Sequence, residues 1–92
     1  MIQENEFTKE LVIHHRGMVP YVAYIVMSGE VQLIDQQGNV KLAGPGEVLG
    51  LMEVWNHMPY EFEIRTSAGT NLLSLDRSLL AKMRQALFNP LA

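Results

Sequence analysis

The residues best suited to binding a ligand gather in one stretch of the sequence, residues 44–62. It opens with Gly44-Pro45-Gly46, a tight turn, and continues through an apolar run to Trp55 and His57 before reaching Pro59. Strand-like patterns flank it on both sides, so we expect a loop or a short helical turn packed against a β framework. If the protein has a ligand site, this stretch is where it is expected.

Metal binding and catalysis are both disfavoured by the spacing of the candidate residues. His14 and His15 are adjacent, and neighbouring residues of a strand point to opposite faces, so the two cannot bind one metal ion from the same side. His57 stands alone in sequence. The pair Glu61 and Glu63 falls on the solvent face of a strand, and no serine has a recognisable histidine and carboxylate partner. We therefore expect no metal, no cofactor and no enzymatic activity.

Composition describes one small domain spanning residues 1–92. Hydrophobic residues make up 48% of the chain and charged residues 18%, which is typical of a globular protein, and there are no cysteines. A net charge of -3 gives no basic surface for nucleic acid. The longest apolar run, residues 19–27, is too short to span a membrane, and the acidic N-terminus does not look like a signal peptide. We expect a cytoplasmic domain that binds neither nucleic acid nor membrane.

The rest of the sequence predicts a β framework followed by one helix. Strand patterns occupy residues 8–14, 22–27, 31–34, 40–42, 60–66 and 71–75. The segment 22–27 is apolar enough to be buried on both faces, whereas 60–66 alternates between apolar and charged residues. The period then changes to that of a helix, with Asp76 or Ser78 as the N-cap and Pro90 as the stop. The predicted fold is mainly β: a small jelly roll, or double-stranded β-helix barrel, over about 8–75, with a C-terminal helix over about 76–88.

Four segments in this order resemble one known family. They are the strand–glycine–strand element at 24–31, the hairpin and turn at 38–50, the paired strands at 59–75 and the helix start at 76–83. Together they resemble the cyclic-nucleotide-binding domain, the β-roll found in the catabolite activator protein family, cyclic-nucleotide-gated channels and kinase regulatory subunits. The resemblance covers roughly residues 11–88. It implies a regulatory or sensory module that binds a small-molecule effector.

The phosphate-binding cassette of that family is altered in this sequence. The resemblance implies a Gly-Glu pair, whose carboxylate holds the ribose, and a Pro-Arg-Ser/Thr-Ala run, whose arginine grips the cyclic phosphate. Here Leu51 follows Gly50, and Pro59 is followed by Tyr60 and Glu61 in place of the arginine and the small hydroxyl residue. We predict that the domain does not bind cyclic AMP or cyclic GMP with regulatory affinity. The residues of this degenerate ligand site are Gly50, Leu51, Met52, Pro59, Tyr60 and Glu61.

Three functions stay open at this point. The first is a non-catalytic sensor whose site has diverged toward another small molecule, uncharged or cationic. The second is a protein–protein interaction or oligomerisation module that uses the apolar loop 49–60, with Met52, Trp55 and Met58 as the contact patch, since methionine and aromatic side chains are enriched in such patches. The third is a residual cyclic nucleotide binder.

Overall fold

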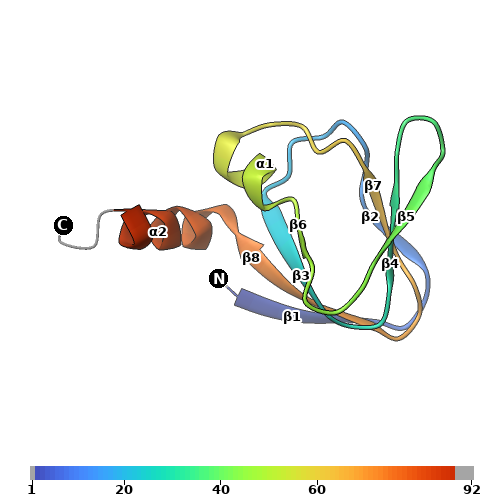
Figure 1. Cartoon of the computed structure of the whole chain (residues 1–92). Coiled ribbons are helices and arrows are strands. Elements are labelled where there is room, and N and C mark those ends of the chain that lie inside the picture. Colours follow the sequence, from blue (N-terminus) through green and yellow to red (C-terminus); the bar gives the residue numbers. More distant parts are fainter. Residues whose placement is uncertain (1, 89–92) are drawn as a thin grey trace.

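The computed structural model, which describes residues 2–88, contains eight strands and two helices in these residues (Figure 1). The strands form two four-stranded antiparallel sheets, and the two layers enclose a roll. Their bounds are β1 (Ile2–Phe7), β2 (Leu11–His14), β3 (Val22–Ser28), β4 (Val31–Ile34), β5 (Val40–Ala43), β6 (Val48–Leu49), β7 (Glu63–Thr66) and β8 (Thr70–Asp76). Helix α1 (Leu51–Asn56) lies between β6 and β7, and α2 (Arg77–Phe88) follows β8.

Most strands pair with a partner far away in sequence, and only β4 and β5 form a hairpin of consecutive strands. One sheet has the order β1-β8-β3-β6 and the other β2-β7-β4-β5. The core fills the space between them, with fully or nearly fully buried side chains from both sheets: Val26, Val31, Leu33, Ala43, Leu49, Tyr60, Ile64 and Leu72. The prediction of a mainly β roll with a C-terminal helix is confirmed.

Strand β1 was not predicted, and it changes the beginning of the roll. The segment predicted as one strand over 8–14 contains a turn at 8–10, and only β2 is extended there. β1 lies before that turn and pairs along its whole length with β8, from Ile2 opposite Leu75 to Phe7 opposite Thr70. Its side chains are mostly exposed and polar, so its sequence carries no apolar alternation, and backbone pairing holds it in place.

The strand that follows the cassette begins later than predicted. Residues 59–62 are irregular, and β7 starts only at Glu63. The predicted alternation of faces nevertheless holds, because Tyr60, Ile64 and Thr66 are all buried. Strand β3 corrects a second expectation: Ala23 is fully buried but Met27 is 48% exposed, so this strand is not buried on both faces along its length.

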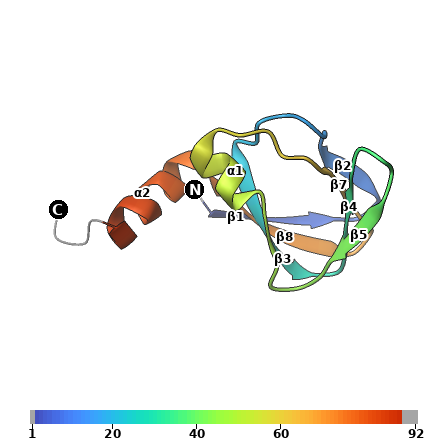
Figure 2. The same ribbon diagram turned by 45° about the horizontal axis from the view of Figure 1, so that its top comes forward.

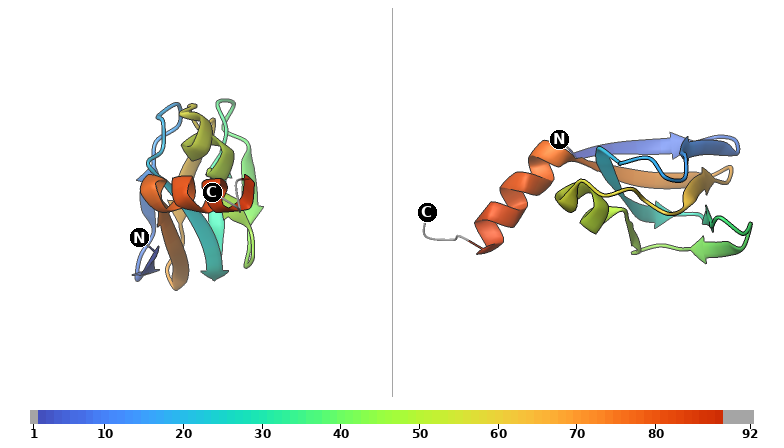
Figure 3. Two further views of the ribbon diagram at one scale, coloured as in Figure 1. Left: turned by 90° about the vertical axis from the view of Figure 1, so that its left-hand side faces the viewer. Right: turned by 90° about the horizontal axis from the view of Figure 1, so that it is seen from above.

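Helix α2 extends away from the roll beside α1, as Figures 2 and 3 show. Asp76, one of the two residues predicted as the N-cap, does cap this helix. The backbone N–H of Leu79 donates a hydrogen bond to Asp76 Oδ1 at 2.8 Å. A small second core joins the two helices to the first sheet and consists of Ala23, Val54, Leu75 and Leu80. Pro90, the predicted stop, lies outside the described residues. Within residues 2–88, neither helix has the length and apolar character needed to cross a bilayer.

Candidate functional site

The cassette helix α1 is bounded by two residues in the left-handed backbone region. Gly50 precedes it with φ 77°, and its carbonyl accepts a hydrogen bond from Val54 N–H at 3.0 Å. His57 ends it with φ 54° and is the one non-glycine residue with a positive φ among those described. Both turns are tight, so α1 is a single short helix whose position is set by β6 on one side and by residues 58–62 on the other.

The inner face of α1 packs against the roll and against α2. Leu51, another predicted ligand residue, is half-buried against the second core. Trp55 is also half-buried, and its indole Nε1–H donates to the carbonyl of Leu80 at 2.9 Å. Met52 and Met58 are instead 56% and 52% exposed. Of the three residues predicted as a contact patch, Trp55 therefore ties α1 to α2 and the two methionines reach the surface.

Tyr60, one of the predicted ligand residues, is part of the core. Its side chain is 8% exposed, and its ring makes edge contacts with His14 and Phe62 at centroid distances of 5.9 and 5.6 Å. Its backbone is fixed as well, because its N–H donates to the carbonyl of Met18 at 3.0 Å and its carbonyl accepts from Gly17 N–H at 2.9 Å. The ring thus fills part of the inside of the roll.

The charges that act on Tyr60 are those of carboxylates. Burial is the main cause that raises the pKa of its hydroxyl to about 12, and Glu53, Glu61 and Glu47 add to the rise in that order. A group that raises the pKa of a phenol disfavours any further negative charge nearby. The local potential at this position therefore opposes an anion.

Arg65 lies on β7 and forms ion pairs on the outer face of the sheet. Its guanidinium pairs with Glu63 at 2.9 Å and with Glu10 at 3.4 Å. Its neighbours Ile64 and Thr66 point into the roll, as the period of a strand requires. Arg65 therefore points away from the buried face on which Tyr60, Ile64 and Thr66 lie.

The raised pKa of Tyr60 predicts a loss of stability in alkali. The folded value is about 12 and the ordinary value is 10.0, so the unfolded chain releases this proton first. Stability from this group is complete below about pH 10 and declines as the pH rises to about 12, by up to about 3 kcal/mol in total. Urea unfolding between pH 9 and 12, compared with Tyr60→Phe, measures the effect. Equal pH dependence in the two proteins would contradict it.

The remaining predicted ligand residues do not meet in one cavity. Pro59 and Glu61 line a pocket of about 640 Å³ on the outside of the roll, together with Arg16, Gly17, Phe62 and the hairpin residues 35–37. The other four do not line it: Gly50 is buried at the start of α1, Met52 is exposed, Leu51 packs toward α2 and Tyr60 fills the core. The sequence did not predict that Arg16 and the hairpin residues 35–37 would line a pocket with Pro59 and Glu61. The sheet register is the signal that places the hairpin there, because β4 pairs with β7 and Ile34 lies opposite Glu63.

His14 and His57 lie in different surroundings. His14 Nε2 lies 3.1 Å from the carbonyl of Met18, beside Tyr60, and burial is the main cause that lowers the pKa of His14. His57 ends α1. Within residues 2–88, no group of three or more His, Asp or Glu side chains lies close enough to hold a metal ion.

Comparison with known proteins identifies the family. Residues 4–86 match the family described as the cyclic nucleotide-binding domain. The potassium channel AKT1 of Oryza sativa subsp. indica is 34% identical over 67 residues, which cover 68% of this chain and 7% of the channel. The chain thus corresponds to a small part of that relative.

Solved structures with the same fold include two kinase regulatory proteins. The regulatory domain of Toxoplasma gondii PKA, in co-crystal with cAMP, superposes with a TM-score of 0.79 at 20% identity, covering 98% of this chain and 37% of that one. The regulatory subunit of a cAMP-independent protein kinase A from Trypanosoma cruzi, bound to guanosine, gives 0.78 at 22% identity, covering 95% and 32%. The order of strands, the short helix before β7 and the family match agree: this chain belongs to the cyclic nucleotide-binding domain family, a family of regulatory modules for small-molecule effectors.

Proposed function

We propose that this chain is a regulatory β-roll that does not bind cyclic AMP or cyclic GMP with regulatory affinity. One observation carries the proposal: Tyr60, which replaces the family's arginine, is 8% exposed and packs against His14 and Phe62 inside the roll. A cyclic phosphate would have to displace this ring and would find carboxylates in place of a guanidinium.

The energetic cost of that change is large. Loss of a desolvated, hydrogen-bonded partner of a charge costs about 2–5 kcal/mol, or about 30- to 4000-fold in affinity. The ribose contact is lost in addition, because Leu51 is committed to packing against the second core. Both losses fall on the two groups by which the resemblance defines cyclic nucleotide recognition.

An effector of the roll, if it takes one, is expected to be uncharged or cationic. The negative potential set by Glu53, Glu61 and Glu47 favours such a molecule over an anion. The Trypanosoma cruzi relative supports this possibility, since it is bound to guanosine, a nucleoside without a phosphate. We therefore propose a diverged small-molecule sensor; of the six predicted site residues, Pro59 and Glu61 line the pocket that would hold such an effector.

Calorimetric titration with cyclic AMP, cyclic GMP and guanosine tests the proposal. We expect no binding of either cyclic nucleotide at micromolar concentrations. The triple variant Leu51→Glu, Tyr60→Arg, Glu61→Ser restores the family's acid, arginine and hydroxyl, and should increase cyclic AMP affinity by at least about 30-fold.

The matched control is Glu63→Ser, which removes a carboxylate from the outer pair with Arg65 and should leave cyclic nucleotide affinity unchanged. Micromolar or tighter binding of cyclic AMP or cyclic GMP to the unmodified chain would overturn the proposal. In that case Tyr60 would have to leave the core on binding.

A second candidate function is contact with another copy of the chain or with a protein partner. Large apolar side chains are exposed on and around the cassette, with Met18 60%, Tyr21 70%, Met52 56% and Met58 52% exposed. Sedimentation over a range of concentrations distinguishes this function, because a strict monomer at high concentration would exclude self-association.

A cytoplasmic location is also proposed, and cell fractionation tests it.

A further inference from the structure

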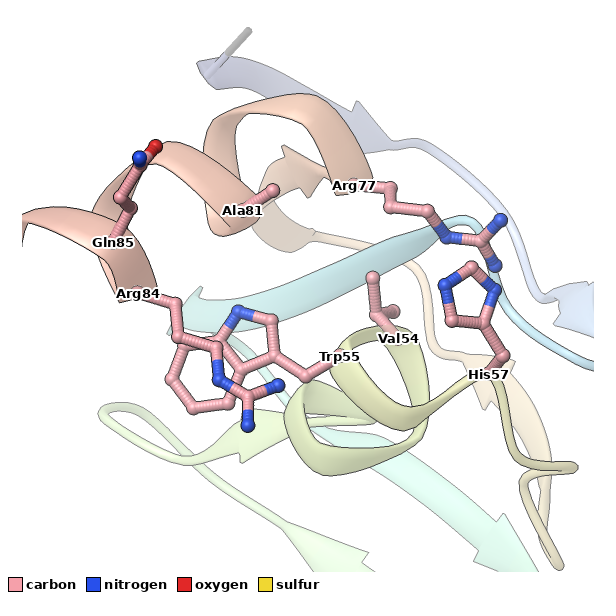
Figure 4. A pocket seen from close by; sticks show the side chains of 7 residues that line it. All are labelled: Val54, Trp55, His57, Arg77, Ala81, Arg84 and Gln85. Carbon is pink, nitrogen blue, oxygen red and sulfur yellow. The ribbon is translucent and has the colours of Figure 1, made fainter. Parts of the chain in front are cut away.

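A second pocket lies outside the roll, in the angle between α1 and α2 (Figure 4). Its volume is about 640 Å³, within the range of small-molecule sites. Val54, Trp55 and Ala81 supply its apolar wall, and His57, Arg77, Arg84 and Gln85 supply polar groups. None of the seven lining residues is acidic, although the chain as a whole has a net charge of -3. The pocket is therefore a local concentration of positive charge on an acidic protein.

The two arginines keep hydrogen-bonding capacity free for a ligand. The guanidinium of Arg77 lies 4.6 Å from the centre of the Tyr21 ring and donates one bond, from Nη2 to the carbonyl of Pro20 at 3.1 Å. Its Nε is buried and has no acceptor among the described residues. Arg84 stacks on Trp55 at 5.7 Å and makes no hydrogen bond or ion pair within the described part of the chain.

His57 provides a third hydrogen-bonding group, and its backbone conformation is unfavourable for a side chain. In Figure 4 its imidazole lies next to the Arg77 guanidinium at one end of the pocket, and Arg84 lies with Trp55 at the other. The residue sits at φ 54° at the end of α1, where glycine is the usual choice. A side chain in this region costs about 1 kcal/mol, and such strain concentrates at functional positions.

We propose that this pocket binds a small organic anion, with a carboxylate or phosphate group on a flat apolar body. Arg84 would bind the anionic group, since guanidinium groups pair with carboxylates and phosphates in a forked geometry. Trp55 would stack on the apolar body, and Val54 with Ala81 would line its other side. None of its seven lining residues is among the six predicted for the roll site.

Trp55 makes the test direct, because it is the single tryptophan of the chain. Its fluorescence and its indole N–H signal in NMR both report on the wall of this pocket and on the contact between α1 and α2. We would titrate the 92-residue chain with benzoate as the probe and with uncharged benzamide as the control ligand. Benzoate should give a saturable shift of the Trp55 signals, and benzamide should bind at least about tenfold more weakly.

The variants separate charge from packing. Arg84 and Lys82 are both exposed on α2, but only Arg84 lines the pocket. Arg84→Gln should weaken benzoate binding by about tenfold, whereas Lys82→Gln, with the same change of charge, should not. His57→Gly should fold at least as well as the unmodified chain and still bind benzoate more weakly.

Three results would overturn the site: no saturable response to benzoate at about 10 mM, equal effects of Arg84→Gln and Lys82→Gln, or equal binding of benzamide. A failure here is distinct from a failure of the proposed function, because cyclic nucleotide affinity is tested by changes at Leu51, Tyr60 and Glu61. Benzoate binding that survives the roll variants and is lost on Arg84→Gln supports the second site alone.

Discussion

Replacing Gly29 by alanine is expected to destabilise the fold by about 3–4 kcal/mol. Gly29 has φ +84°, a conformation that costs an L-residue about 1–2 kcal/mol. A Cβ at this position would also lie 2.7 Å from the Cα and 2.8 Å from the Oγ1 of Thr70. The first of these atoms is backbone, so it cannot rotate away, and the turn between β3 and β4 must separate from the start of β8.

That separation would break the hydrogen bonds that join the two turns. Thr70 is fully buried, and its hydroxyl donates to the carbonyl of Glu30 at 2.9 Å and accepts from Glu30 N–H at 3.3 Å. Urea unfolding of Gly29→Ala measures the loss. Gly38→Ala is the matched control, because Gly38 has φ +85° but no atom within 4 Å of its added Cβ. Gly38→Ala should cost only about 1–2 kcal/mol. Equal losses in the two variants would show that the contact with Thr70 does not matter.

Truncating Tyr60 to alanine is the second large effect expected. The ring is a buried member of the main core, so its removal should cost about 3–5 kcal/mol. Tyr60→Phe keeps the ring contacts with His14 and Phe62 and should change stability by less than about 1 kcal/mol. Thermal or urea unfolding of both variants gives the comparison.

This pair of variants also bears on function. In a roll with an open ligand cavity, the side chain at this position faces solvent in the unliganded state, and its truncation has little effect on folding. A cost below about 1 kcal/mol for Tyr60→Ala would therefore contradict a filled interior and would reopen the third hypothesis, a residual cyclic nucleotide binder. A cost near the expected value supports a position used for packing.

The framework was predictable where local pattern and tertiary role agree. β4 and the hairpin after it follow from β-branched residues bounded by turn residues, and α2 follows from its period and from Asp76 at its N-cap. The position of Tyr60 inside the roll also follows from alternation with Ile64 and Thr66.

The missed features depend on partners distant in sequence. β1 is held by backbone pairing with β8 and by side-chain hydrogen bonds of Glu4 and Asn5 to that strand, and no apolar alternation marks its residues. The pocket between α1 and α2 depends on the angle between two helices, which Trp55 and Leu80 set by a hydrogen bond across 25 positions of sequence. No sequence motif links His57 with Arg84, so their meeting in one pocket could not be predicted from the sequence.

The polar strand β1 has a consequence for the solubility of the domain. It occupies the outer edge of its sheet and presents Glu4 and Glu6 there, and it shields the backbone groups of β8 behind it. If β8 were the edge strand, its unpaired backbone groups could pair with a strand of another chain. Acidic side chains on an edge strand disfavour such pairing because they repel one another. Deleting β1 would expose the backbone groups of β8 and make the domain prone to aggregation.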